Sequence, residues 1–183
     1  MCIQSLHLEK WEVSSSELLS SSDQINAGIA LIESNLSVSL TDEYKSHLHF
    51  VNARTSWCKE GNDYFLAQYN DATIKVLMSV MFPPDSVITL TKLLRESIYD
   101  HRTLLLPGLI VIGCDYDDEA DAYLIYDTRV DSSTYKCIFH WRYYEDNLIV
   151  GNGLGFVAHS LKEFLQLPVN PEQLQEAEIK TWK

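Results

Sequence analysis

Hydrophobic positions recur at helical spacing in the first part of the chain. Two sets of such positions are Ile25, Ile29, Ile32 and Leu36, and then Tyr44, Leu48 and Val51. Asp23 stands directly before the first set and Thr41 before the second, and both residue types cap helix N-termini. Asp42 and Glu43 then favour the positive end of the second helix dipole. The pattern predicts two helices that pack together as a hairpin.

The hydrophobic pattern changes to that of β-strands between residues 64 and 82. DYFLAQY and TIKVLMSVMF are rich in β-branched and aromatic residues, and the turn-forming NDA separates them. Pro83 and Pro84 cannot donate ladder hydrogen bonds, so they end this pair of strands. A third helix is expected next. Its inner face is predicted to consist of Leu90, Leu93, Leu94 and Ile98.

Four short β-rich runs follow at intervals typical of an antiparallel meander. They are residues 109–114, 122–126, 135–141 and 148–150. GNGLG at 151–155 lacks the lysine and the hydroxyl of a phosphate-binding loop, so it is interpreted as a turn.

The pattern returns to helical spacing near the end of the chain. Ser160 and Glu163 have the S-x-x-E spacing of a reciprocal cap, which predicts a helix that ends before Pro168. Pro171 is suited to the first position of a last helix, which is predicted to run through Ile179.

Length and composition indicate one globular domain. The chain has 183 residues, and 46% of them are hydrophobic. We predict a flexible Ser-rich lead-in over residues 1–22 and a single domain over residues 23–183. No apolar run approaches the roughly 20 residues of a membrane span, and the start of the chain lacks the pattern of a secretory signal. A cytoplasmic protein is therefore expected, with its four separated cysteines as buried free thiols.

The charge balance favours a basic partner. The formal net charge is −12, and a field of this sign repels nucleic acid and anionic lipid. We therefore expect a protein partner, with no nucleic acid and no membrane involved.

An acidic cluster is the densest concentration of this charge. Five carboxylates fall within residues 115–121: Asp115, Asp117, Asp118, Glu119 and Asp121. Clustered charge accelerates encounter with an oppositely charged protein, and aromatic side chains supply desolvated contacts. Tyr143 and Tyr144 are close in sequence, so we assign them to the same partner-binding surface. Trp141 is interpreted as a core residue. The alternative is a solvated hairpin turn whose carboxylates discourage edge-to-edge pairing of sheets.

Metal binding and catalysis find little support in the pattern. A calcium loop would need glycine at Ala120 and a bidentate glutamate at Tyr126, and it would need helices on both flanks. His47 and His49 are two positions apart on a predicted helix, whereas metal pairs use three or four. No G-x-S-x-G elbow occurs. We therefore predict no catalytic residue, no metal and no cofactor. A metal-dependent hydrolase that uses Asp115 and Asp121 is kept as a minor alternative.

Three stretches together resemble the SUKH superfamily, which includes immunity proteins of bacterial toxin systems and cell-wall-assembly regulators. They are IALIESNLSVSLTDEYKSHLHFVNA, LLPGLIVIGCDYDDEADAYLIYD and VAHSLKEFLQL, and the resemblance spans roughly residues 24 to 168. It implies an α+β domain: a twisted, mostly antiparallel sheet with N-terminal helices and a C-terminal helix packed against it. It also implies protein binding without catalysis.

The leading hypothesis joins this resemblance to the charge. It is a non-catalytic immunity protein that covers the active cleft of a cognate toxin, such as a basic nuclease, with an acidic surface. A regulatory or scaffolding module that binds a housekeeping protein is the alternative, and gene neighbourhood distinguishes the two.

Overall fold

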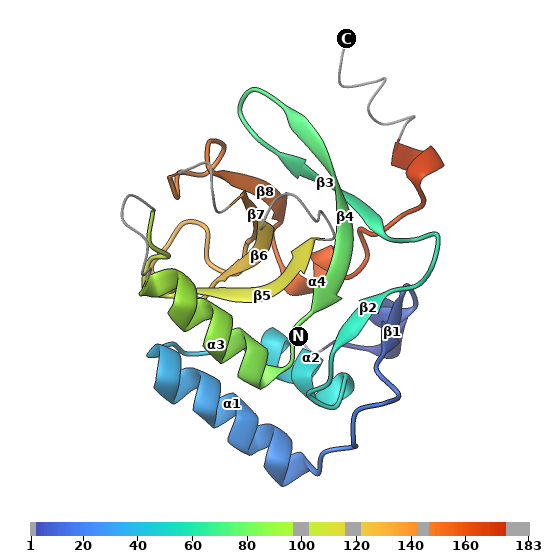
Figure 1. Cartoon of the computed structure of the whole chain (residues 1–183), viewed down its shortest axis with the longest axis vertical. Coiled ribbons are helices and arrows are strands. Elements are labelled where there is room, and N and C mark those ends of the chain that lie inside the picture. Colours follow the sequence, from blue (N-terminus) through green and yellow to red (C-terminus); the bar gives the residue numbers. More distant parts are fainter. Residues whose placement is uncertain (1–2, 97–102, 116–121, 143–146, 175–183) are drawn as a thin grey trace.

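The computed structural model describes residues 3–96, 103–115, 122–142 and 147–174. Its elements are η1 (Ser5–Leu8), β1 (Trp11–Val13), α1 (Ser22–Leu36), α2 (Asp42–Phe50), β2 (Ser56–Cys58), β3 (Tyr64–Gln68), β4 (Thr73–Met81), α3 (Pro84–Arg95), β5 (Leu109–Asp115), β6 (Ala122–Asp127), β7 (Ile138–Arg142), β8 (Leu154–Ala158) and α4 (Leu161–Phe164). The fold is α+β: a curled antiparallel sheet carries N-terminal helices and a C-terminal helix, as the sequence predicts (Figure 1).

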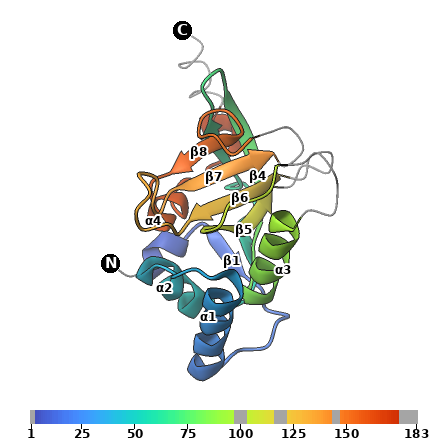
Figure 2. The same ribbon diagram turned by 90° about the vertical axis from the view of Figure 1, so that its left-hand side faces the viewer.

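The sheet curls until strands distant in sequence meet. Its order is β1-β2-β4-β3-β8-β7-β6-β5, and an additional pairing joins β4 to β5. Six strands therefore form a closed cycle of pairings, β4-β3-β8-β7-β6-β5. The long strand β4 makes this possible because its first half pairs with β3 and its second half with β5, with a register shift between Met78 and Val80. The helices α1, α2 and α3 lie together on one side of this sheet (Figures 1 and 2).

Neighbouring residues of the central strands point into two different cores. Ile110 and Ile112 of β5 belong to the larger core, which also contains the inner faces of α1 and α2. Leu109 and Val111 belong to a smaller core with Leu94 of α3. Because both faces of β5 are buried, its sequence is a continuous apolar run and does not alternate.

Local capping signals locate two of the helices correctly. Thr41 accepts a hydrogen bond from the main-chain N–H of Tyr44 and caps α2, as predicted. Ser160 likewise caps α4, but the Glu163 carboxylate accepts from His159 and not from Ser160. The cap of α1 differs from the prediction.

That cap is Ser21 and not Asp23. The Ser21 hydroxyl accepts from Gln24 N, and the Gln24 amide oxygen accepts from Ser21 N. Asp23 lies inside the first turn of the helix.

The N-terminal prediction also needs correction, because residues 3–13 belong to the domain. Trp11 is 4% exposed, packs against Phe164 and donates from Nε1 to the carbonyl of Leu165 at 2.8 Å. β1 pairs with β2. The predicted boundary at residue 23 is therefore too late for this part of the chain.

Several other boundaries differ from the prediction. β7 begins at Ile138, three residues later than expected, because residues 132–136 form turns. Residues 148–150 contribute only an isolated bridge at Val150, and the strand is β8, which includes part of the stretch interpreted as a turn. Leu93, which the sequence predicts on the inner face of α3, is 49% exposed. Ile98 lies outside the described residues, as does the predicted last helix beyond Leu174.

The cysteine prediction is confirmed for Cys58 and Cys137, which are buried free thiols, whereas Cys114 is half-buried. Burial raises the pKa of Cys58 to about 12. No helix in the described part of the chain is long and apolar enough to cross a membrane.

Candidate functional site

The predicted acidic cluster connects β5 to β6. β5 ends at Asp115, whose backbone lies opposite Met78 of β4, and β6 begins at Ala122. The other four carboxylates of the cluster lie outside the described residues. They are Asp117, Asp118, Glu119 and Asp121.

The strand register relates this connection to the predicted tyrosines. β7 ends at Arg142, which pairs directly with Ala122, the first residue of β6. The segment after Arg142 therefore starts beside the point where the acidic connection ends. Tyr143 and Tyr144 themselves lie outside the described residues. The structure thus brings the attachment points of both predicted segments to one edge of the sheet.

Trp141 belongs to the core, as the sequence predicts. It is fully buried and lies in the smaller core with Phe139 and Leu154. Its cross-strand partner Tyr123 is half-buried against the same core. Trp141 therefore packs inside the smaller core and offers no surface to a partner.

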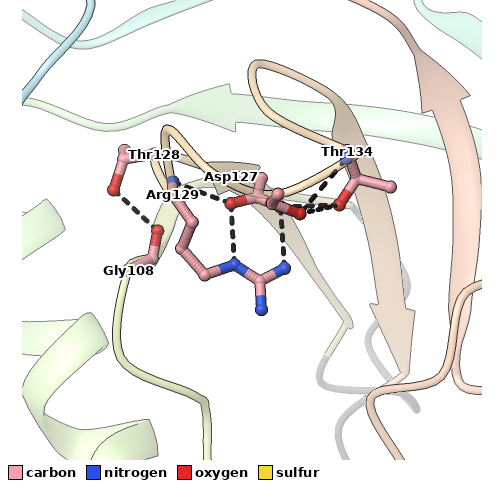
Figure 3. A network of polar contacts seen from close by, with 6 residues as sticks. Gly108, Asp127, Thr128, Arg129 and Thr134 are labelled. Atoms are coloured by element: carbon pink, nitrogen blue, oxygen red, sulfur yellow. Dashed lines mark hydrogen bonds and ion pairs between the residues drawn. The ribbon is translucent and has the colours of Figure 1, made fainter.

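The opposite end of β6 holds a buried carboxylate, Asp127 (Figure 3). One of its oxygens accepts from the main-chain N–H and from Nε of Arg129, both at 2.9 Å. The other accepts from Nη2 of Arg129 and from the Thr134 hydroxyl, both at 2.7 Å. Each carboxylate oxygen therefore has two donors, and this group stabilises the connection between β6 and β7.

The electrostatics of Asp127 agree with a structural role. Burial on its own would raise the pKa of this carboxyl, but the hydrogen bonds from Arg129 and Thr134 hold the pKa below its ordinary value. The same contact raises the pKa of Arg129. Both groups are charged at neutral pH and satisfy each other, so neither is free to bind a ligand through this contact.

Gly108 completes the Asp127 network from the start of β5. Its carbonyl accepts from the main-chain N–H and the hydroxyl of Thr128, at 2.9 and 2.7 Å. Its φ of +83° suits glycine, and a Cβ there would lie 2.3 Å from Cγ of Arg129. The Arg129 side chain therefore passes directly over Gly108, as Figure 3 shows.

A second buried titratable group lies on α2. His47 is 2% exposed, and its Nδ1 has no hydrogen-bond partner within the described structure. Burial lowers the pKa of His47 to about 4, so the imidazole is neutral at physiological pH. His49 is exposed and contacts Asn26, which confirms that the two histidines diverge.

A metal site is not found in the part of the chain that the structure covers. No group of three or more His, Cys, Asp or Glu side chains among the described residues is placed to hold an ion.

One cavity was missed by the sequence analysis. It lies between β3, β8 and residues 167–174, and its volume is about 480 Å³. Its walls come from segments that are far apart in the chain, and β8 was interpreted in part as a turn. The local signal for this wall is the short apolar run LGFVA at 154–158.

The fold defines a mixed α+β protein with a curled antiparallel sheet. No family model, no curated protein and no solved structure matches this chain. The resemblance to the SUKH superfamily therefore stays a prediction from the sequence.

Proposed function

We propose that this chain is a non-catalytic protein-binding domain that engages a basic partner through the edge formed by β5, β6 and β7. In the sharpest form of the proposal, it is an immunity protein that neutralises a toxin domain by covering its active cleft. The resemblance to the SUKH superfamily supports this form.

The observation that carries the proposal is the pairing of Ala122 with Arg142. This pairing joins the end of the acidic connection to the start of the segment that contains Tyr143 and Tyr144. Charge for steering and aromatic surface for desolvated contact therefore leave the fold at neighbouring strand ends.

The negative charge of the chain supports a basic partner. The formal net charge is −12, and the acidic cluster contains five carboxylates and no basic residue. A basic nuclease holds a positively charged cleft for phosphates, and carboxylates imitate the charge of that substrate. The buried strands β5 to β7 fix the two ends of the acidic connection, at Asp115 and Ala122, and the start of the tyrosine segment after Arg142.

The proposal requires that a secreted protein with a C-terminal toxin domain is encoded next to this chain, and this domain, expressed on its own, is the probe of the direct test. Its affinity is measured for the wild type and for a variant with D115N, D117N, D118N, E119Q and D121N. We expect the variant to bind about tenfold more weakly or worse, mainly through a slower association rate, because steering depends on the charge. The wild type is expected to block the toxin activity.

A matched control removes five charges elsewhere. Glu9, Glu60, Asp71, Asp131 and Glu172 are exposed on other elements, and their amide variants change the net charge by the same amount. This control should retain most of the affinity. Equal weakening by both variants would reduce the proposal to a general charge effect, and no binding of the toxin by the wild type would reject it.

A further inference from the structure

The cavity between β3 and β8 lies where the sheet opens for a single residue. Tyr64 at one end of β3 exchanges main-chain hydrogen bonds with Val169, at 3.1 and 2.8 Å. Gln68 at the other end pairs with Phe156 of β8. Leu66 lies halfway between them and lines the cavity, and no strand pairing in the described structure reaches it from this side.

Strand geometry directs the main-chain groups of Leu66 toward this opening. Alternate residues of an antiparallel strand direct their N–H and C=O groups to the same side. The bonds of Tyr64 with Val169 assign that side to residues 64, 66 and 68. The main-chain N–H of Tyr69 donates to the carbonyl of Ala72 at 2.8 Å within the β3–β4 hairpin. The main-chain N–H and C=O groups of the odd-numbered residues therefore face β4. The N–H and the C=O of Leu66 are therefore directed to the cavity side.

The cavity lining selects an uncharged ligand. Its polar side chains are Gln68, Thr73 and Gln173, and the other lining residues are aliphatic or aromatic, such as Phe65 and Leu167. None of them is ionisable, so a buried carboxylate or ammonium group would lose its hydration without an ionic partner. Gln68 and Gln173 are exposed, so the cavity opens to solvent.

The size of the opening excludes a long peptide strand. Both flanking pairings, at Tyr64 and at Gln68, would have to break before a partner strand could extend along β3. One residue-like unit fits, with an N–H and a C=O spaced to exchange two hydrogen bonds with Leu66. The volume of about 480 Å³ lies in the range of small-molecule sites and leaves room for an apolar tail.

We propose that this cavity binds a small, uncharged N-acyl amino-acid amide, which pairs through its amide unit with the main chain of Leu66 and buries its acyl chain against Phe65 and Leu167. This site is separate from the β5–β6–β7 edge and does not depend on the proposed partner binding.

The test titrates the full-length protein with N-octanoylglycinamide and follows binding by two-dimensional ¹H–¹⁵N NMR. We expect saturable binding, with the largest shifts at the amide of Leu66 and at cavity residues. The matched control ligand is the ester analogue, octanoyloxyacetamide, which has an oxygen in place of the acylated N–H. It should bind about tenfold more weakly, because the carbonyl of Leu66 then loses its donor.

Two variants examine the cavity from different walls. Leu167→Trp fills it from a half-buried position, and Gln173→Trp fills it from an exposed position, where the fold tolerates the change. Both are expected to weaken binding at least tenfold, whereas Glu172→Trp, on an adjacent exposed residue, should not. The proposal is overturned if the amide probe does not saturate, if the ester binds equally well, or if folded Gln173→Trp binds like the wild type.

Discussion

The two ends of β6 use carboxylates in opposite ways. At the Asp127 end, one carboxylate is fully buried and four donor contacts from Arg129 and Thr134 satisfy it. At the Ala122 end, five carboxylates precede the strand with no basic residue among them. A carboxylate that the fold satisfies contributes to stability, whereas we propose that the cluster of unbalanced charge meets a partner. The same residue type therefore predicts two different experimental results.

The largest effect is expected from Asp127→Ala. This change leaves the Arg129 guanidinium and the Thr134 hydroxyl without their acceptor, and it empties a buried site. Removal of one partner from a fully buried pair costs about 3–5 kcal/mol, and the lower end applies because the Arg129 side chain is 37% exposed. The free energy of unfolding, measured in urea, should fall by about 3 kcal/mol.

Asp131→Asn is the matched control for this change. Asp131 is an exposed carboxylate in the same connection, and its substitution should change the stability by less than about 0.5 kcal/mol. If Asp127→Ala were as stable as this control, the structural role of the Asp127 network would be wrong.

A pH series separates the contributions of His47 and Asp127 to stability. The pKa of His47 is lowered to about 4 in the fold. Its contribution to the free energy of unfolding is therefore complete above the ordinary pKa of 6.5 and is lost as the pH falls from 6.5 toward 4. The pKa of Asp127 is also lowered, so its contribution is complete above 3.8 and is lost below that value. The His47 window therefore lies above the Asp127 window.

The His47 window is tested with His47→Met. Between pH 7 and about pH 4.5, the wild type should lose about 2 to 3 kcal/mol through this histidine, because only the unfolded chain takes up the proton. Over the same pH range, the free energy of unfolding of the variant, measured in urea, should fall by that much less than the free energy of the wild type. His49→Met, an exposed position on the same helix, should follow the wild-type curve. Parallel curves for His47→Met and the wild type would contradict the assignment.

The smallest effect on stability is expected from the five amide substitutions in the acidic cluster. If these carboxylates serve a partner, as proposed, they have no role in stabilising the fold, so the unfolding free energy should change by less than about 0.5 kcal/mol. Thermal and urea unfolding measure this directly. A loss of several kcal/mol would mean that these carboxylates belong to the fold, as Asp127 does.

Local signals predicted much of the fold. The caps at Thr41 and Ser160 were recognisable because a cap depends on a few adjacent residues. Trp11 was missed because the carbonyl that it contacts, that of Leu165, is 154 residues away. β8 was missed because GNGLG contains turn-forming residues, and its pairing with β7 comes from the curled sheet.

The candidate site was predictable in its composition but not in its arrangement. The sequence shows the acidic cluster directly, whereas the alignment of Ala122 with Arg142 depends on the β6–β7 register. The cavity at Leu66 was beyond local patterns, since it needs Val169 at one end of β3 and Phe156 at the other.

The most direct test of the central claim is the association rate constant with the neighbouring toxin domain at about 50 and about 500 mM salt, where screening is weak and strong respectively. The wild type should associate at least about tenfold faster at low salt, and the five-site amide variant should be slow with little salt dependence. Equal rates and equal salt dependence for the two proteins would contradict the claim that the acidic edge of β5, β6 and β7 meets the partner.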